Sequence, residues 1–389
     1  MKVGIFITDI LFRTGGTEAY CAYIMYALQK IYDYPEITVL SEKYKGMEIN
    51  NINVVSRLNS LFGLSIKDIN INLKLIFDDD EKFIQRTIFR HKLKIASKKY
   101  DLFFNCAMNS YTFSAKYNVD IIHFPPYSKT KTEIVKKYPF LYFSALLNDL
   151  LFSKGYNLYI ANSLFTMWWL EKIWHIDKEK ITVIYPAVNQ VLPSKNEKTN
   201  SIFVCSRIEQ SKNIEVLIDT FLSCEILTKT FKLIIAGAVA EETMPYFEKL
   251  KEMSSDYIDS IILHKNPSRS DIESYYNQSK IFWHAKGYGV DEESNPSELE
   301  HFGITTAEAM SAGCVPVVIN KGGQKEIVEN GINGFRWDTP EELIEKTIYL
   351  IQHEDERKKM SECAIEKSKH YSLDNFTENL GKVLKSKFT

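Results

Sequence analysis

The chain has 389 residues, more than the roughly 250 to 300 at which a single hydrophobic core stops growing, so we expect two domains. Its composition, 45% hydrophobic and 25% charged, supports large buried cores and excludes an intrinsically disordered chain. The net charge of −2 is unevenly distributed: residues 1–195 hold 25 Lys+Arg against 18 Asp+Glu, and the remainder holds 23 against 32. A basic first half would suit an anionic membrane surface or acceptor, although uneven charge without such a role is equally consistent.

No uninterrupted run of about 18 apolar residues occurs, and the segment MKVGIFITDI lacks the basic region, apolar core and cleavage site of a signal peptide. We therefore expect a cytoplasmic protein without a spanning helix. The six cysteines lie far apart and form no CxxC pair, which favours free, buried thiols over disulfides or zinc. They are Cys21, Cys106, Cys205, Cys224, Cys314 and Cys363.

Short β-rich runs alternate with longer helical stretches, a pattern typical of parallel sheets covered by helices on both faces. The sequence therefore predicts an α/β fold. The acidic run Asp78–Glu81 is interpreted as the solvated start of a helix. In the first half, strands are predicted at 3–8, 36–40, 102–105, 119–123, 158–161 and 181–185.

A domain boundary is predicted in the polar, proline-containing segment PAVNQVLPSKNEKTN, residues 186–200. We assign residues 1–195 to a first doubly wound domain and residues 196–370 to a second, facing each other across a cleft with ligand at the carboxyl ends of the strands. The last stretch, residues 371–389, has the apolar spacing of a helix expected to pack back toward the first domain. In the second half, strands are predicted at 201–208, 231–237, 258–264, 280–285 and 314–319, with a helix beginning at Ile214.

The most informative segment runs from residue 295 to residue 335. Within it Thr305 and Glu308 have the S/T-x-x-E spacing of a capping box, so we expect a short helix that Gly313 ends. The preceding loop, Phe302, Gly303, Ile304 and Thr305, then leads into a helix amino terminus. Unpaired N–H groups and the helix dipole make such a terminus suitable for a diphosphate.

Glu300 and Glu308 stand eight positions apart on either side of this loop. In isolation, Glu308 would only complete the cap and Glu300 would be a solvated side chain. The segment EHFGITTAEAMSAGCVPV, however, strongly resembles glycosyltransferase family 4, which is marked by two glutamates separated by seven residues. The resemblance implies a retaining enzyme of the GT-B fold, in which Glu308 binds the ribose hydroxyls and Glu300 contacts the donor sugar. It also implies that the loop 302–305 supplies backbone contacts to the diphosphate and sugar.

Arg207 and Lys212 follow the first predicted strand of the second domain, in SIFVCSRIEQSKN. Isolated cations at such positions are usually solvated surface charges. Their spacing resembles the family's Arg, four residues, Lys arrangement, which implies that both neutralise the leaving diphosphate. We find no DxD pair after an apolar strand, so we expect neither a metal ion nor another cofactor.

The first half contributes a glycine pair and a histidine. Gly15 and Gly16 lie where the first strand turns into a helix that Thr17 would cap. GGTE resembles the family's glycine-rich loop, which reaches over the donor phosphates or borders the acceptor. No G-x-G-x-x-G follows the strand, which counts against an oxidoreductase. His123 ends an apolar strand; a structural role is the ordinary interpretation, whereas IIHFPP resembles the sugar-binding version in lipid-linked-glycan mannosyltransferases.

Several other residues have two interpretations. Asn162 and Ser163 end a strand and would face the pocket, or Ser163 would cap the following helix. By resemblance, the segment 265–272, with Asn266, borders the nucleotide base. The segment WHAKGYG, beginning at Trp283, would lie near the sugar, although Trp283 itself suits a core. For Gly322, Gly323 and the ENGINGF turn, the simplest role is turn geometry with a positive φ.

The predicted function is transfer of a sugar from GDP-mannose or a UDP-sugar to a glycan acceptor in polysaccharide or glycoconjugate biosynthesis. A lipid-linked acceptor is expected, with a soluble acceptor or a protein as the alternatives. The basic and apolar segment 131–152 suits either an interfacial helix, with the protein peripheral on the inner membrane face, or a buried domain helix. No nucleic-acid partner is expected. The alternatives are a nucleotide-sugar epimerase or hydrolase of the same fold and a non-catalytic sugar-binding protein.

Overall fold

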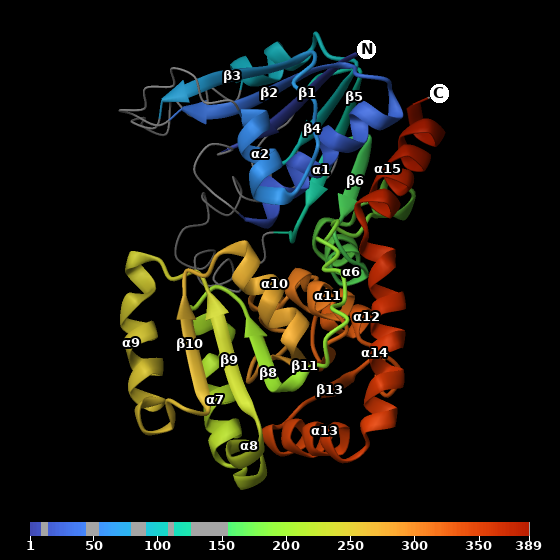
Figure 1. The fold of residues 1–389 in the computed structure, drawn as a ribbon. Coiled ribbons are helices and arrows are strands. Elements are labelled where there is room, and N and C mark those ends of the chain that lie inside the picture. Colours follow the sequence, from blue (N-terminus) through green and yellow to red (C-terminus); the bar gives the residue numbers. More distant parts are fainter. Residues whose placement is uncertain (9–14, 44–53, 79–90, 108–112, 126–154, 389) are drawn as a thin grey trace, which may run out of the picture. The chain divides into compact units, whose positions relative to one another are not determined.

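The computed structural model describes residues 1–8, 15–43, 54–78, 91–107, 113–125 and 155–388. The chain divides into two compact units, which are described separately. Unit 1 comprises Met1–Ala187 with Leu373–Thr389, and unit 2 comprises Val188–Ser372. Each contains a parallel sheet with helices against it (Figure 1), so the prediction of two doubly wound α/β domains is confirmed.

The described residues of unit 1 form a seven-stranded sheet in the order β3-β2-β1-β4-β5-β6-β7. The prediction missed β3, an edge strand, and wrongly gave Asp78 to a helix start. Asp78 is the last residue of β3, and residues 79–81 lie outside the described residues. The strands are β1 Lys2–Ile7, β2 Glu36–Lys43, β3 Ile71–Asp78, β4 Leu102–Asn105, β5 Tyr117–Ile122, β6 Leu158–Ala161 and β7 Ile181–Val183. The helices are α1 Gly16–Ile31, α2 Val54–Phe62, α6 Leu164–Trp174 and α15 Leu373–Phe388.

Successive residues of the unit 1 strands face opposite sides of the sheet, so the core has two halves. Ile5 and Ile7 of β1 belong to the half that α1 and α15 cover. Phe6, between them, belongs to the half that includes Leu170 and Trp174 of α6. The near-continuous burial of these strands is what a parallel sheet covered on both faces requires.

The described residues of unit 2 form a six-stranded parallel sheet in the order β10-β9-β8-β11-β12-β13. The short edge strand β13 was not predicted. The strands are β8 Thr199–Cys205, β9 Lys232–Gly237, β10 Ile261–Lys265, β11 Ser279–His284, β12 Val315–Ile319 and β13 Phe335–Trp337. The helices are α7 Ile214–Leu222, α8 Glu225–Thr230, α9 Met244–Met253, α10 Arg269–Gln278, α11 Ile304–Ser311, α12 Gln324–Ile327, α13 Pro340–Gln352 and α14 Glu354–Ser368.

The core of unit 2 is also divided by its sheet. Trp283 is fully buried in the half that α7 and α13 cover, and its indole Nε1 donates to Thr347 Oγ1 at 3.0 Å. Phe203 lies in the other half with Tyr276 of α10. Trp283 is therefore a core residue, which fits the simpler of its two interpretations.

The observed boundary lies earlier than residue 195. Val188 N–H donates to Tyr371 O at 2.8 Å, and Val191 N–H donates to Ser311 Oγ at 2.9 Å. These bonds tie residues 188–195 to unit 2, so the predicted boundary between 195 and 196 is wrong by eight residues. At the other end the chain leaves unit 2 after Ser372, and α15 belongs to unit 1.

The helix α15 buries one face in unit 1. Phe376, Leu380 and Leu384 are buried in the same core as α1, and Phe376 makes an edge-to-face contact with Tyr20 at 5.2 Å between ring centroids. Removing such side chains leaves a cavity as well as losing apolar burial. Unit 1 therefore depends on the last helix of the chain.

Leu380→Ala tests this dependence. We expect it to lower the free energy of unfolding of unit 1 by about 2 to 5 kcal/mol, because Leu380 is fully buried. Glu378→Ala on the same helix is the control: it removes an exposed ion pair with Lys382 and should cost at most about 1 kcal/mol. Urea denaturation followed by circular dichroism measures both. Equal, small losses would show that α15 does not stabilise unit 1.

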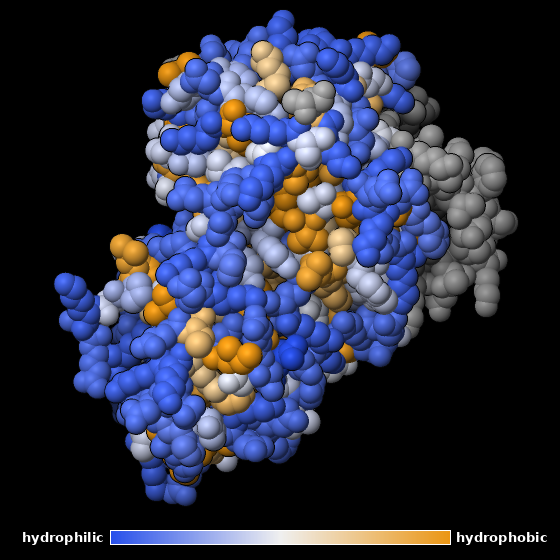
Figure 2. Space-filling model, turned by 90° about the vertical axis from the view of Figure 1, so that its right-hand side faces the viewer, coloured by the Kyte–Doolittle hydropathy of each residue, from blue (hydrophilic) through white to orange (hydrophobic). Residues whose placement is uncertain are grey.

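The face drawn in Figure 2 is mostly hydrophilic, with hydrophobic side chains gathered in small groups. None of the described helices is long and apolar enough to span a bilayer. Cys21, Cys106, Cys205 and Cys314 are free and buried, as predicted, whereas Cys224 is half-buried and Cys363 is exposed. The segment 131–152 lies outside the described residues.

Candidate functional site

The strand order of unit 2 creates a switch point between β8 and β11. From β8 the chain winds outward through β9 and β10, then returns to β11 on the other side of β8. Loops at the carboxyl ends of these two strands diverge, and ligands of such sheets bind in the resulting crevice. Most of the polar residues singled out above lie in loops that follow β8, β10 and β11 or in the segment leading into α11.

Glu300 is the centre of one cluster at this edge. Lys212, in a short 3-10 helix after β8, donates from Nζ to Glu300 Oε2 at 2.9 Å. His284, the last residue of β11, has Nε2 3.5 Å from the same oxygen. Burial alone would raise the pKa of Glu300, but Lys212, Lys286 and His284 more than offset it and hold that pKa well below its usual value. Glu300 is therefore an ionised carboxylate among positive or hydrogen-donating groups.

Two glycines hold the Glu300 backbone in place. Gly323 N–H donates to Glu300 O at 2.8 Å. A Cβ on Gly322 would lie 2.4 Å from Glu300 O, and one on Gly323 would lie 2.3 Å from His301 O. Gly322 has the predicted positive φ of 58°, but Gly323 has a φ of −66°, so the expectation of turn geometry is wrong for Gly323. Close approach of the two backbones requires glycine there.

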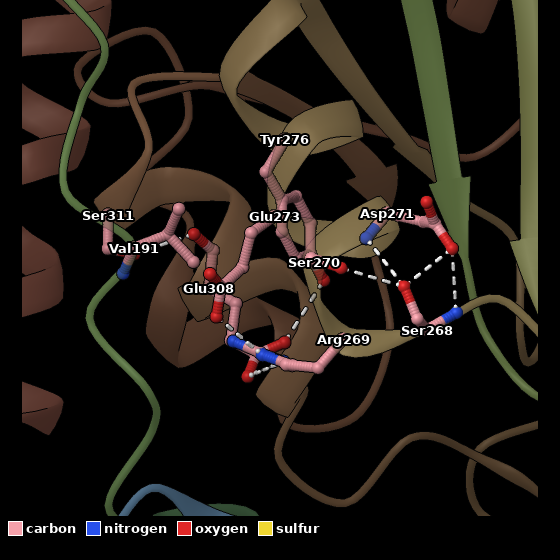
Figure 3. A network of polar contacts seen from close by, with 9 residues as sticks. All are labelled: Val191, Ser268, Arg269, Ser270, Asp271, Glu273, Tyr276, Glu308 and Ser311. Atoms are coloured by element: carbon pink, nitrogen blue, oxygen red, sulfur yellow. Dashed lines mark hydrogen bonds and ion pairs between the residues drawn. The ribbon is translucent and has the colours of Figure 1, made fainter.

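Glu308 is the centre of a second cluster. Arg269, the first residue of α10, donates from Nη1 to Glu308 Oε1 at 2.9 Å and also bonds Glu273 at 2.8 Å (Figure 3). Tyr276 donates from its hydroxyl to Glu308 Oε2 at 3.2 Å. The Glu308 residue is 6% exposed. Burial raises the pKa of Glu308, and Arg269 and Tyr276 only partly oppose that effect.

This geometry corrects the predicted capping box. The N-cap of α11 is Gly303, with a φ of 129°, and the helix begins at Ile304 rather than after Thr305. Glu308 cannot return to the helix start, because Arg269 and Tyr276 hold its carboxylate on the α10 side. The first-turn N–H groups, including those of Ile304 and Thr305, have no partner inside the helix and remain a suitable place for an anion.

The two clusters approach each other at the end of β8. Cys205, the last residue of that strand, is buried, and burial followed by the Glu308 charge raises the pKa of its thiol. Arg269 and Lys212 act on the same thiol in the opposite direction. Both clusters therefore lie within electrostatic reach of one atom, along one edge of the sheet.

The remaining unit 2 candidates differ in how accessible they are. The Arg207 side chain is 71% exposed and lies 3.2 Å from Glu209, so it can turn toward a ligand. Asn266 has a φ of 54°, and its Oδ1 accepts a bond from Val239 N–H at 2.8 Å, linking the ends of β10 and β9. Phe302 is buried against Tyr371, so only its backbone is available to a ligand.

The unit 1 candidates follow β1, β5 and β6. Gly15 is the N-cap of α1 and Gly16 its first residue; Gly15 N–H donates to Glu18 Oε2 at 2.8 Å, so the predicted cap by Thr17 is wrong. Both glycines are exposed. Ser163 Oγ accepts from Thr166 N–H at 3.0 Å, as a helix cap does.

His123 follows the last residue of β5. Its ring contacts Tyr20 edge-to-face at 5.6 Å, and its Nε2 is buried without a hydrogen-bond partner among the described residues. Burial lowers the pKa of His123 to about 4, so the ring is neutral at pH 7. A buried, unpaired imidazole nitrogen is unusual in a purely structural residue.

Sequence reasoning did not single out Arg269, Tyr276, His284 or Lys286. Arg269 lies in the segment 265–272 that the resemblance assigned to the nucleotide, but its partner Glu308 is 39 residues away. His284 and Lys286 lie in the WHAKGYG segment, which the resemblance placed near the sugar without assigning a role to either residue. Among the described residues, no group of three His, Cys, Asp or Glu side chains could hold a metal ion.

Known proteins resemble both the sequence and the fold. Residues 190–367, within unit 2, match the family described as "Glycosyl transferases group 1". A sucrose synthase of Melioribacter roseus is 32% identical over 173 residues, which are 40% of this chain and 20% of that protein. An uncharacterized glycosyltransferase of Methanocaldococcus jannaschii is 26% identical over 209 residues, covering 53% of this chain and 54% of that protein. The chain thus spans from a fifth to about half of these relatives.

The structure of Anabaena HepE in complex with UDP-glucose is similar across 99% of this chain and all of that one, with a TM-score of 0.71 at 16% identity. The similarity therefore extends beyond the 190–367 segment to both units. The chain has the GT-B fold.

Proposed function

We propose that the chain is a glycosyltransferase that moves a sugar from a nucleoside diphosphate to an acceptor hydroxyl. The observation that carries this proposal is the pairing of two clusters, Glu300 with Lys212 and Glu308 with Arg269, at the switch point beside the start of α11. One cluster suits the diphosphate and sugar, and the other suits a ribose. The family match over residues 190–367 and the sucrose synthase relatives support the same donor class.

In the proposed reaction the diphosphate lies against the α11 amino terminus, with Arg207 and Lys212 at its oxygens. Negative charge grows on the β-phosphate as the glycosidic bond breaks, and these cations with the helix N–H groups stabilise it. Lys212 would then donate hydrogen bonds to a phosphate oxygen as well as to Glu300. Glu300, kept ionised, would accept hydrogen bonds from the sugar hydroxyls and stabilise positive charge at the anomeric carbon.

The acceptor hydroxyl would attack from the face that the diphosphate leaves, and the departing phosphate would take its proton, so the anomeric configuration is retained. No metal ion is needed, because protein cations and helix N–H groups supply the positive charge. In unit 1, Gly15 and Gly16 would approach the donor, and His123 Nε2, which has no hydrogen-bond partner among the described residues, would bond the transferred sugar.

The proposed acceptor is a lipid-linked glycan, and the proposed donors are GDP-mannose or a UDP-sugar. A peripheral membrane position and a role in polysaccharide or glycoconjugate biosynthesis belong to the same proposal. They rest on the resemblance of IIHFPP to lipid-linked-glycan mannosyltransferases and on the basic, apolar segment 131–152. These proposals therefore depend on different observations from the donor-site proposal, and either can fail without the other.

Product analysis tests the function. Purified protein is incubated in EDTA with GDP-mannose or UDP-sugars and with glycan acceptors, free and lipid-linked, and the products are examined by NMR. We expect nucleoside diphosphate release that depends on the acceptor and a product with the donor's anomeric configuration. Release without any acceptor product would instead favour a hydrolase, a changed sugar would favour an epimerase, and binding without turnover would favour a sugar-binding protein.

A further inference from the structure

A turn after β11 lies between the two segments that build the Glu300 cluster. Tyr288 N–H donates to Ala285 O at 3.0 Å and closes the turn. Asn213 Nδ2, next in sequence to Lys212, donates to Ala285 O at 3.2 Å and to Tyr288 O at 3.4 Å. The turn is thus fixed to the segment that carries Lys212.

The same turn is tied to the Glu300 segment. Gly287 has a φ of 103°, and a Cβ there would lie 2.8 Å from Leu299 Cδ2. Lys286 therefore projects from a turn that neighbours of both Lys212 and Glu300 hold in place. Its position is determined by the fold and is not that of a freely moving surface lysine.

Lys286 has no direct partner in the described part of the chain, although Glu300 and Glu209 attract it from a greater distance. The side chain is half-buried, and none of the described residues forms a hydrogen bond or ion pair with it. Glu300, the carboxylate with the larger effect on Lys286, already accepts a hydrogen bond from Lys212, and Glu209, with the smaller effect, lies 3.2 Å from Arg207. Burial lowers the pKa of Lys286, Lys212 and Arg207 lower it further, and the attraction of Glu300 and Glu209 does not restore it. Burying a cation that has no direct partner costs free energy, and an anion bound next to it would offset that cost. Lys286 lies beside the proposed diphosphate site, where such an anion would bind.

We propose that Lys286 is a third cation of the donor site and binds an anionic oxygen of the donor. This inference rests on the proposed function. The anionic oxygen has two sources, the β-phosphate of any nucleotide sugar or a carboxylate on the sugar of a nucleotide uronate. A lysine ammonium serves either, because it is a compact charge with three donors rather than a planar fork matched to one geometry.

The test measures the affinity of wild type, Lys286→Met and Lys286→Arg by calorimetry for UDP, UDP-glucose and UDP-glucuronate. GDP, GDP-mannose and GDP-mannuronate form the parallel set. Lys280→Met is the matched control, because Lys280 lies near the start of β11, the strand whose other end leads into the Lys286 turn, and bonds Asn200 at 3.0 Å. We expect Lys286→Met to bind its anionic partner about 10- to 100-fold more weakly, and Lys286→Arg and Lys280→Met to bind within about threefold of wild type.

The two sources give different patterns. Equal weakening for the diphosphate, the hexose and the uronate identifies the β-phosphate, whereas weakening confined to the uronate identifies the sugar carboxylate. Unchanged affinities in Lys286→Met, or losses in Lys286→Arg as large as in Lys286→Met, overturn the inference and leave the proposed function standing. A wild type that binds none of the six ligands overturns both.

Discussion

Replacing Glu300 with glutamine should lower the transfer rate by about 10²- to 10³-fold while leaving the affinity for nucleoside diphosphate within a fewfold of wild type. The substitution keeps the shape of the side chain and removes its charge. Lys212, at 2.9 Å, loses its ion-pair partner and remains available to the diphosphate. The variant loses the negative charge that would face the anomeric carbon. That charge affects the transfer rate rather than donor binding, because positive charge develops at this carbon only as the glycosidic bond breaks. Steady-state kinetics with saturating donor, combined with calorimetry, separates the two effects.

Glu298→Gln is the control for this experiment. Glu298 is exposed and ends a short 3-10 helix, two residues before Glu300. Its replacement therefore makes the same chemical change outside the Glu300 cluster. It should retain wild-type rates. If Glu300→Gln keeps a third or more of the wild-type rate, or if Glu298→Gln is equally impaired, the role assigned to Glu300 is wrong.

Glu308→Gln should abolish the discrimination between ribose and 2′-deoxyribose. In the proposed site the buried carboxylate accepts bonds from the ribose hydroxyls, so wild type should bind UDP or GDP more tightly than the 2′-deoxy nucleotide. Hydrogen bonds to a charged group contribute about 1.5 to 3 kcal/mol, so the preference should be roughly 10- to 100-fold. In the variant the two nucleotides should bind alike, both weakly. Comparing the two ligands separates ribose binding from any general disturbance of the fold.

Glu273→Gln is the matched control for Glu308. Both glutamates bond Arg269, but the Glu273 side chain is 46% exposed whereas that of Glu308 is 8% exposed. Loss of the Glu273 bond should leave the ribose preference intact, because Arg269 keeps its bond to Glu308. A preference that survives in Glu308→Gln, or one that disappears in Glu273→Gln, would show that Glu308 does not bind the ribose.

The sequence was sufficient for the class of fold but not for all of its strands. Central strands such as β1 and β9 are apolar and buried at every residue after the first, a pattern that predicts a parallel sheet. The edge strands β3 and β13 pair on one side only. Such strands do not need apolar residues throughout: β3 places Asn72 and Lys74 between apolar residues, and β13 has only three residues. Neither edge strand therefore has the long apolar run by which the other strands were predicted.

Part of the site also followed from spacing along the chain. Glu300, Glu308, Arg207 and Lys212 lie in two short segments, each recognisable by itself. Arg269 could be identified only from its bond to Glu308 in the structure. The two residues are far apart in sequence and come together because α10 and α11 pack on the same face of the sheet. The capping-box error has the same origin. The spacing of Thr305 and Glu308 fits a capping box, but in the structure Glu308 bonds Arg269 and Tyr276 of α10 instead.

The most direct test of the donor site is a crystal structure of the wild-type protein with UDP-glucose or GDP-mannose, grown in EDTA. The account predicts a diphosphate at the amino terminus of α11 within reach of Arg207 and Lys212, ribose hydroxyls at Glu308, and the sugar against Glu300. No metal ion should bridge the phosphates. A nucleotide bound elsewhere in unit 2, or one held through a metal ion, would contradict the assignment of the donor site.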